Sequence, residues 1–70
     1  MEEFLSKVAE ILEVESVTPD FKFREIEEWD SLKGFSLIVL MEQDYGKEMS
    51  VDTFLQCETV GDLAMFAGVA

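Results

Sequence analysis

The longest helical pattern in the chain is the stretch DSLKGFSLIVLMEQDYG, residues 30–46. Asp30 is a good N-cap, because its side chain can accept a hydrogen bond from a free N–H group at a helix start. Gly46 is typical of a helix end, since glycine readily takes the left-handed conformation that closes a helix. These two signals predict a helix that runs from Ser31 to Tyr45.

The predicted helix has apolar side chains on more than one face. With about 100° between successive residues, one face collects the residues that we assign to the core: Gly34, Leu37, Ile38, Met41 and Tyr45. Leu32, Phe35 and Val39 fall on a different face beside Ser31, and Leu40 fits neither group. A small monomer has no obvious use for a second apolar stripe, so this stripe is a candidate contact surface. The alternative is that Phe35 and Val39 pack under a loop or a third helix.

Three shorter segments also have helical signals. Residues 2–13 repeat apolar side chains at helical spacing and carry acidic residues in the first turn. Residues 50–56 could form one or two turns that begin at a serine cap. Thr59 and Asp62 have the spacing of a capping box, which predicts a last helix that ends at about residue 66 or 67.

Residues 15–29 show no clear repeat, and they predict a long loop between the first two helices. Apolar side chains would anchor this loop across the helices: Val17, Phe21, Phe23 and Ile26. No segment has the alternation of a strand. The sequence therefore predicts an all-α fold, a small four-helix bundle with a long loop between helices 1 and 2 and a short third helix, in a single domain over residues 1–70.

The chain is strongly acidic, with 16 Asp and Glu against 5 Lys and Arg and a formal net charge of -11. We expect no nucleic-acid binding, because phosphate backbones need cationic neutralisation, and an anionic membrane surface would repel the chain. The expected partners are proteins with basic patches. No secretory signal opens the sequence, and the apolar run 37–41 is far too short for a bilayer, so we expect a cytoplasmic protein.

Several kinds of catalytic and metal site are excluded by composition. The chain has no histidine and one cysteine. It therefore cannot form a Ser–His–Asp triad, a Cys–His pair or a zinc site. Catalysis by a pair of carboxylates would need a pocket for the substrate, and 70 residues leave little room for one. Cys57 has nothing basic nearby in sequence, so we interpret it as a buried or half-buried small residue. We therefore expect no enzyme and no metal, but a protein on which other enzymes act.

Ser31 is the main candidate for a functional residue. It would lie at the start of the predicted helix, beside free N–H groups and the positive end of the helix dipole, where a phosphate is well placed. The competing interpretation is that Ser31 only supports the cap, since serine and aspartate are common at helix starts in any protein.

With these motifs in place, the chain resembles the acyl carrier protein family. The resemblance rests on EWDSL at residues 28–32, LIVLME at 37–42, YG at 45–46 and TVGDL at 59–63, and it covers nearly the whole chain. It implies that Ser31 is esterified by 4′-phosphopantetheine, donated by coenzyme A through a separate transferase. The carrier would then hold acyl intermediates as thioesters on this arm and present them to partner enzymes.

The resemblance also implies roles for other residues of the second helix. Asp30 would help a phosphopantetheinyl transferase to position its metal and the serine, in addition to capping the helix. Partner enzymes that transfer or modify acyl groups would read this helix, through the residues Leu32, Phe35, Val39 and Glu42. A monomer is expected, and lipid metabolism or fatty acid biosynthesis is the expected setting.

Four residues depart from the pattern of carriers in fatty-acid synthesis. Lys33 and Ser36 stand where that group usually has acidic residues, Trp29 stands where a smaller residue is common, and Gly34 lowers helix propensity by up to about 1 kcal/mol. They indicate a specialised carrier. Two alternatives stay open: a non-covalent acidic interaction module, and a peptidyl or D-alanyl carrier, although peptidyl carriers commonly have glycine where this chain has Asp30. Burial of the cargo between helices also stays open.

Overall fold

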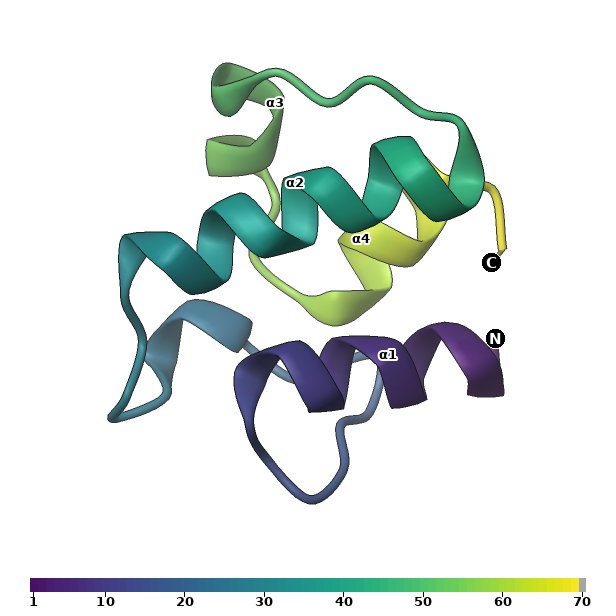
Figure 1. The fold of residues 1–70 in the computed structure, drawn as a ribbon. Coiled ribbons are helices and arrows are strands. Elements are labelled where there is room, and N and C mark those ends of the chain that lie inside the picture. The colour runs from purple at the N-terminus through teal and green to yellow at the C-terminus, as the bar shows by residue number, and fades with distance from the viewer. Residues whose placement is uncertain (70) are drawn as a thin grey trace.

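Four α-helices account for most of the computed structural model, which describes residues 1–69. They are α1 (Glu2–Leu12), α2 (Ser31–Tyr45), α3 (Val51–Gln56) and α4 (Val60–Ala67), as Figure 1 shows. Within the described residues there is no strand. The predicted all-α fold with a short third helix is therefore confirmed.

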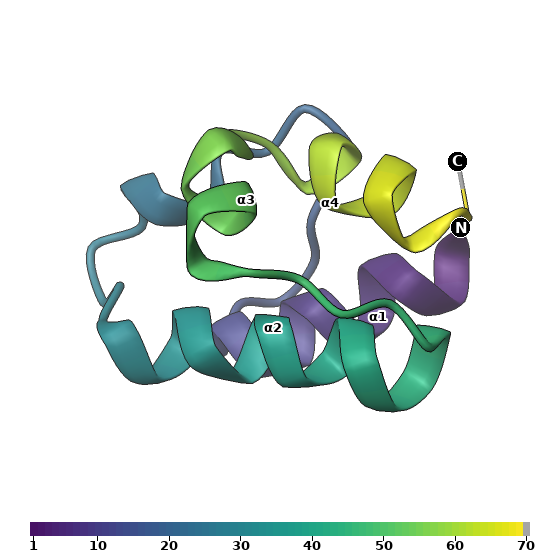
Figure 2. The same ribbon diagram turned by 90° about the horizontal axis from the view of Figure 1, so that it is seen from above.

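α2 is the longest helix, and in the view of Figure 1 it runs between α3 above it and α1 below it. The end of α4 lies near the start of α1, as both views show (Figures 1 and 2). One cluster of buried side chains joins all four helices and the loop, and its largest fully buried members are Phe4, Phe23, Leu12, Leu37, Met41, Leu63, Val8 and Val60. Apolar burial of this kind is the main force that holds so small a chain together.

Leu40 shows why a single helical stripe was too narrow a description of α2. The sequence placed Leu40 in neither apolar group, yet the side chain is buried. It lines the same shallow depression as Ile11 of α1. Because α2 is covered on opposite sides, it buries a wider arc than one stripe of side chains.

The connection between α1 and α2 is more ordered than its sequence predicts. It contains a short 3-10 helix, η1 (Phe23–Glu25), which the search for helical repeats missed because such a turn is too short to show a period. The predicted anchoring is confirmed: Val17 and Phe23 are buried, and Phe21 and Ile26 are partly buried against the core.

Backbone hydrogen bonds tie this connection to the start of α4. The Val60 N–H donates to the carbonyl of Phe21 at 2.9 Å, and the Gly61 N–H donates to the carbonyl of Pro19 at 2.6 Å. A Cβ atom on residue 61 would lie only 2.8 Å from that Pro19 oxygen. Glycine is needed here so that the two backbones can approach each other this closely.

The predicted capping box at the start of α4 is confirmed. The Asp62 N–H donates to Thr59 Oγ1 at 3.2 Å, and Asp62 Oδ2 accepts from the N–H groups of Thr59 at 3.2 Å and Glu58 at 2.9 Å. The hydrogen bonds from these two backbone N–H groups lower the pKa of the Asp62 carboxyl below its usual value.

This shift gives Asp62 a pH-dependent effect on stability. A lowered folded-state pKa adds stability above the unfolded value of 3.8, and that stability is lost as the pH falls through the folded pKa. We expect Asp62→Asn to lower the melting temperature at pH 7, while near pH 2 the two proteins melt together, since the amide resembles a protonated carboxyl. Melting curves across this range measure the difference. A difference in melting temperature between the two proteins that stays constant with pH would contradict this explanation.

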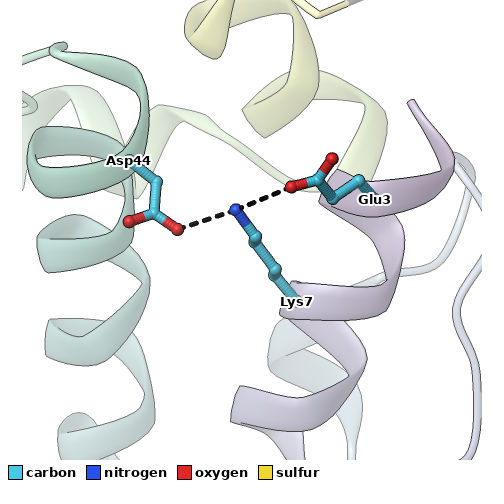
Figure 3. A network of polar contacts seen from close by, with 3 residues as sticks. All are labelled: Glu3, Lys7 and Asp44. Atoms are coloured by element: carbon cyan, nitrogen blue, oxygen red, sulfur yellow. Dashed lines mark hydrogen bonds and ion pairs between the residues drawn. The ribbon is translucent and has the colours of Figure 1, made fainter.

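Lys7 links α1 to the end of α2, as Figure 3 shows. Its Nζ lies 2.9 Å from Asp44 Oδ2 and 3.2 Å from Glu3 Oε1, and it also lies over the ring of Tyr45 at 5.5 Å from the centroid. The hydrogen bonds to Asp44 and Glu3 raise the pKa of Lys7. An ion pair this exposed contributes little to the stability of the fold on its own. It does place one positive charge between an acidic residue of α1 and an acidic residue of α2.

Candidate functional site

Ser31 is the first residue of α2, and its side chain is exposed. The cap of the helix is made by Asp30, whose Oδ1 accepts a hydrogen bond from the Lys33 N–H at 2.9 Å. Among the described residues, the Ser31 hydroxyl has no hydrogen-bond partner, so the helix start does not depend on it. This hydroxyl is free for chemistry from outside the protein.

An apolar groove of about 300 Å³ begins at Ser31 and runs between α2 and α3. Its lining residues come from α2, α3 and the preceding loop: Ser31, Gly34, Phe35, Ile38, Val51, Phe54, Leu55, Trp29 and Arg24. The α2 members are spaced three, four and seven residues from Ser31, which places them on one face of the helix. Figure 2 shows α3 beside α2.

The rings of Trp29 and Phe54 line the groove, and the fully buried ring of Phe23 packs against both of them in the core. The centroid of Phe23 lies 5.7 Å from that of Trp29 and 5.5 Å from that of Phe54. Trp29 and Phe54 are stacked, with centroids 6.3 Å apart and an angle of 15° between their planes. These separations are within the range in which aromatic pairs attract each other.

Gly34 allows the stacked rings to pack directly against the backbone of α2. A Cβ atom at this position would lie 3.2 Å from Trp29 Cζ2 and 3.3 Å from Phe54 Cε2. Both separations are tighter than ordinary carbon contacts. The low helix propensity of Gly34 is therefore the cost of this close packing beside Ser31.

Arg24 holds the end of α3 in place. Its guanidinium donates hydrogen bonds to the carbonyl oxygens of Leu55, at 3.2 Å, and of Cys57. It also lies over the rings of Phe23 and Phe54, at 5.4 and 5.7 Å from their centroids. The sequence indicates Phe54 as an apolar contact of the third helix, and the side chain is buried. It does not indicate Arg24, because nothing in the local sequence around that residue points to contacts with distant segments.

The residues predicted to bind partners lie in different environments. Leu32 is 75% exposed and Phe35 is 65% exposed, so neither is covered by the loop or by α3. Val39 is partly buried, and Glu42 is exposed two turns further along the helix than Phe35. Partner binding by these residues stays a prediction, and Phe35 also lines the groove beside Ser31.

Lys33, which stands where carriers of fatty-acid synthesis usually have an acidic residue, is turned back toward α1. Its Nζ lies 3.3 Å from Glu13 Oε2, and only 12% of its side chain is exposed. Glu13 ends α1 in the left-handed conformation, with a φ of 60°. The Lys33 charge is thus paired within the molecule.

The described residues, 1–69, hold no group of three or more His, Cys, Asp or Glu side chains arranged to bind a metal ion. No helix in this part of the chain has both the length and the apolarity to cross a membrane.

The fold places an exposed serine at the start of the second helix of a small bundle, with an apolar groove beside it. In the comparison with protein families, the sequence model of the phosphopantetheine attachment site matches residues 2–66, so the chain belongs to this family. The family carries a covalently attached 4′-phosphopantetheine group. No curated protein and no solved structure matches the chain.

The residues present fit this prosthetic group. The exposed hydroxyl of Ser31 would supply an attachment atom, and the helix dipole of α2 would favour a negative phosphodiester at that end. Carrier domains of this family are not catalytic themselves, and they work with a phosphopantetheinyl transferase and partner enzymes.

Proposed function

We propose that Ser31 carries the 4′-phosphopantetheine group and that the protein presents acyl groups to other enzymes without being an enzyme itself. When bound, the group supplies a terminal thiol that holds acyl groups as thioesters. The observation that carries this proposal is the exposed Ser31 hydroxyl, which has no partner among the described residues and begins α2. Asp30 makes the cap in its place, so modification of Ser31 leaves the helix start intact.

The surroundings of Ser31 support a carrier of apolar acyl groups. Leu32 and Phe35 leave an apolar surface next to the attachment atom, and the groove offers shelter to a chain attached there. Glu42 lies on the same helix and would attract partner enzymes with basic patches. We assign the protein to a specialised pathway of lipid metabolism in the cytoplasm, where it acts as a monomeric single domain.

The test uses the purified protein, coenzyme A, magnesium and a phosphopantetheinyl transferase of broad specificity. We expect the intact mass to increase by one phosphopantetheine, and peptide mapping to place the added mass on Ser31. An unchanged mass with several transferases would contradict the proposal. It would favour the second candidate, a non-covalent interaction module, which the exposure of Leu32 and Phe35 also supports.

Two substitutions of Asp30 separate its role as a cap from its role toward the transferase. We expect Asp30→Ala to destabilise the protein by about 1 kcal/mol, since the N-cap hydrogen bond to Lys33 is lost. Asp30→Asn keeps a good N-cap, so its stability should be close to that of the parent. Its rate of modification should still fall by about tenfold or more, because the carboxylate that helps position the metal is gone. Equal modification rates for Asp30→Asn and the parent would exclude this second role.

A further inference from the structure

We propose that Trp29 and Gly34 determine which acyl groups this carrier can shelter, and that these are uncharged, medium-length aliphatic chains lying against the Trp29 indole. The inference rests on the proposed attachment of the acyl arm to Ser31. It adds a specificity role for two residues that depart from the pattern of carriers in fatty-acid synthesis.

The groove is continuous with the attachment residue. Ser31 itself lines it, and Gly34 follows one turn later on the same face of α2. A chain that begins at Ser31 therefore meets Gly34 and the Trp29–Phe54 stack before it can reach deeper residues. Burial of its methylene groups against these rings is favourable, and the gain grows with each group that is buried.

Gly34 controls the space at this point. A Cβ at position 34 would lie 3.2 Å from Trp29 Cζ2 and 3.3 Å from Phe54 Cε2, which is tighter than an ordinary contact, so it fits only if a ring shifts. A larger residue at position 34 would push the rings outward or fill the groove itself. Because α3 is held by Arg24 through the Leu55 and Cys57 carbonyls, Phe54 cannot easily move away.

The groove favours an uncharged chain. Arg24 is the one charged side chain in its lining, and its guanidinium already donates to two carbonyl oxygens and lies over two aromatic rings. A carboxylate at the end of the acyl group would lose water and meet mainly apolar walls, which is costly. The volume of about 300 Å³ lies at the lower end for small-molecule pockets, which favours chains of medium length over long ones.

The experiment loads the protein with acyl-phosphopantetheine from a series of acyl-coenzyme A donors: acetyl, octanoyl, hexadecanoyl and succinyl. Loading on Ser31 is verified by mass before each measurement. We expect octanoyl to raise the melting temperature by roughly 5 °C over acetyl. The succinyl protein should melt at the same temperature as the acetyl protein, and the hexadecanoyl protein should melt no higher than the octanoyl protein. Trp29 is the only tryptophan, so its fluorescence reports on the groove. Its emission should shift to shorter wavelength in the octanoyl protein but not in the acetyl protein.

Variants assign the effect to particular residues. Gly34→Val should abolish the octanoyl gain, and Gly34→Ala, the milder change, should reduce it. Trp29→Ala should move the largest gain from octanoyl to a longer chain. Leu55→Ala should weaken the gain because Leu55 lines the groove. Met65 is also an exposed apolar residue but lies on α4 outside the groove, so Met65→Ala should leave the gain unchanged.

Three results would overturn the inference while the carrier function stands: equal melting temperatures for acetyl and octanoyl protein, a succinyl gain as large as the octanoyl gain, or a full octanoyl gain in both Gly34 variants. A protein that accepts no acyl-phosphopantetheine at all would overturn both proposals. The mass measurement therefore distinguishes the two kinds of failure.

Discussion

Ser31→Ala is expected to abolish phosphopantetheinylation completely. The substitution removes the only atom at the start of α2 to which the proposed phosphodiester can be joined, and no other hydroxyl begins this helix. The fold should not suffer, because Asp30 provides the cap and the Ser31 side chain is exposed. Intact mass after incubation with coenzyme A and a transferase measures the loss, and a melting curve verifies that the variant is folded.

Ser36→Ala is the matched control for this variant. Ser36 lies on the same helix and is also exposed, but it is more than one turn away from the helix start. It should gain the same mass as the parent. If Ser36→Ala failed to gain mass while Ser31→Ala gained it, the attachment residue would have been assigned wrongly.

Phe23→Ala should have the largest effect on stability, a loss of about 3–5 kcal/mol. Phe23 is fully buried and contacts Trp29, Phe54 and Arg24 at once, so a cavity at this position would loosen the loop and α3 together. A small domain has little stability in reserve, so the variant should be largely unfolded at room temperature. Circular dichroism during urea titration measures this.

Phe35→Ala makes the same chemical change at an exposed position. Its side chain is 65% exposed, so removal of the ring should change stability by no more than about 0.5 kcal/mol. A loss of similar size in both variants would mean that the packing around Phe23 does not hold the loop in place.

The helix ends could be predicted because their signals are local. Asp30 and Gly46 mark the two ends of α2 through hydrogen bonds to residues three to five positions away. The capping box of Thr59 and Asp62 is equally local. Each of these contacts lies within a few residues of the sequence pattern that predicts it. Ser31 was also placed correctly at the first position of α2, since the cap determines where the helix begins.

The groove could not be predicted, because its walls come from segments that are distant in sequence. Arg24 reaches carbonyl groups 31 and 33 residues further along the chain. No local pattern indicates such contacts, nor that Trp29 would stack on Phe54. The burial of Leu40 was missed for a related reason, since it depends on neighbours that pack on both sides of α2.

The ion pair between Lys33 and Glu13 has a consequence for association kinetics. At separations beyond the screening length of about 8 Å at physiological ionic strength, a paired cation and anion cancel, so an incoming protein experiences position 33 as neutral. The carboxylates around it still set the sign of the potential near Ser31. We therefore expect the encounter rate with a basic partner to fall steeply with added salt, as it does for uniformly acidic surfaces.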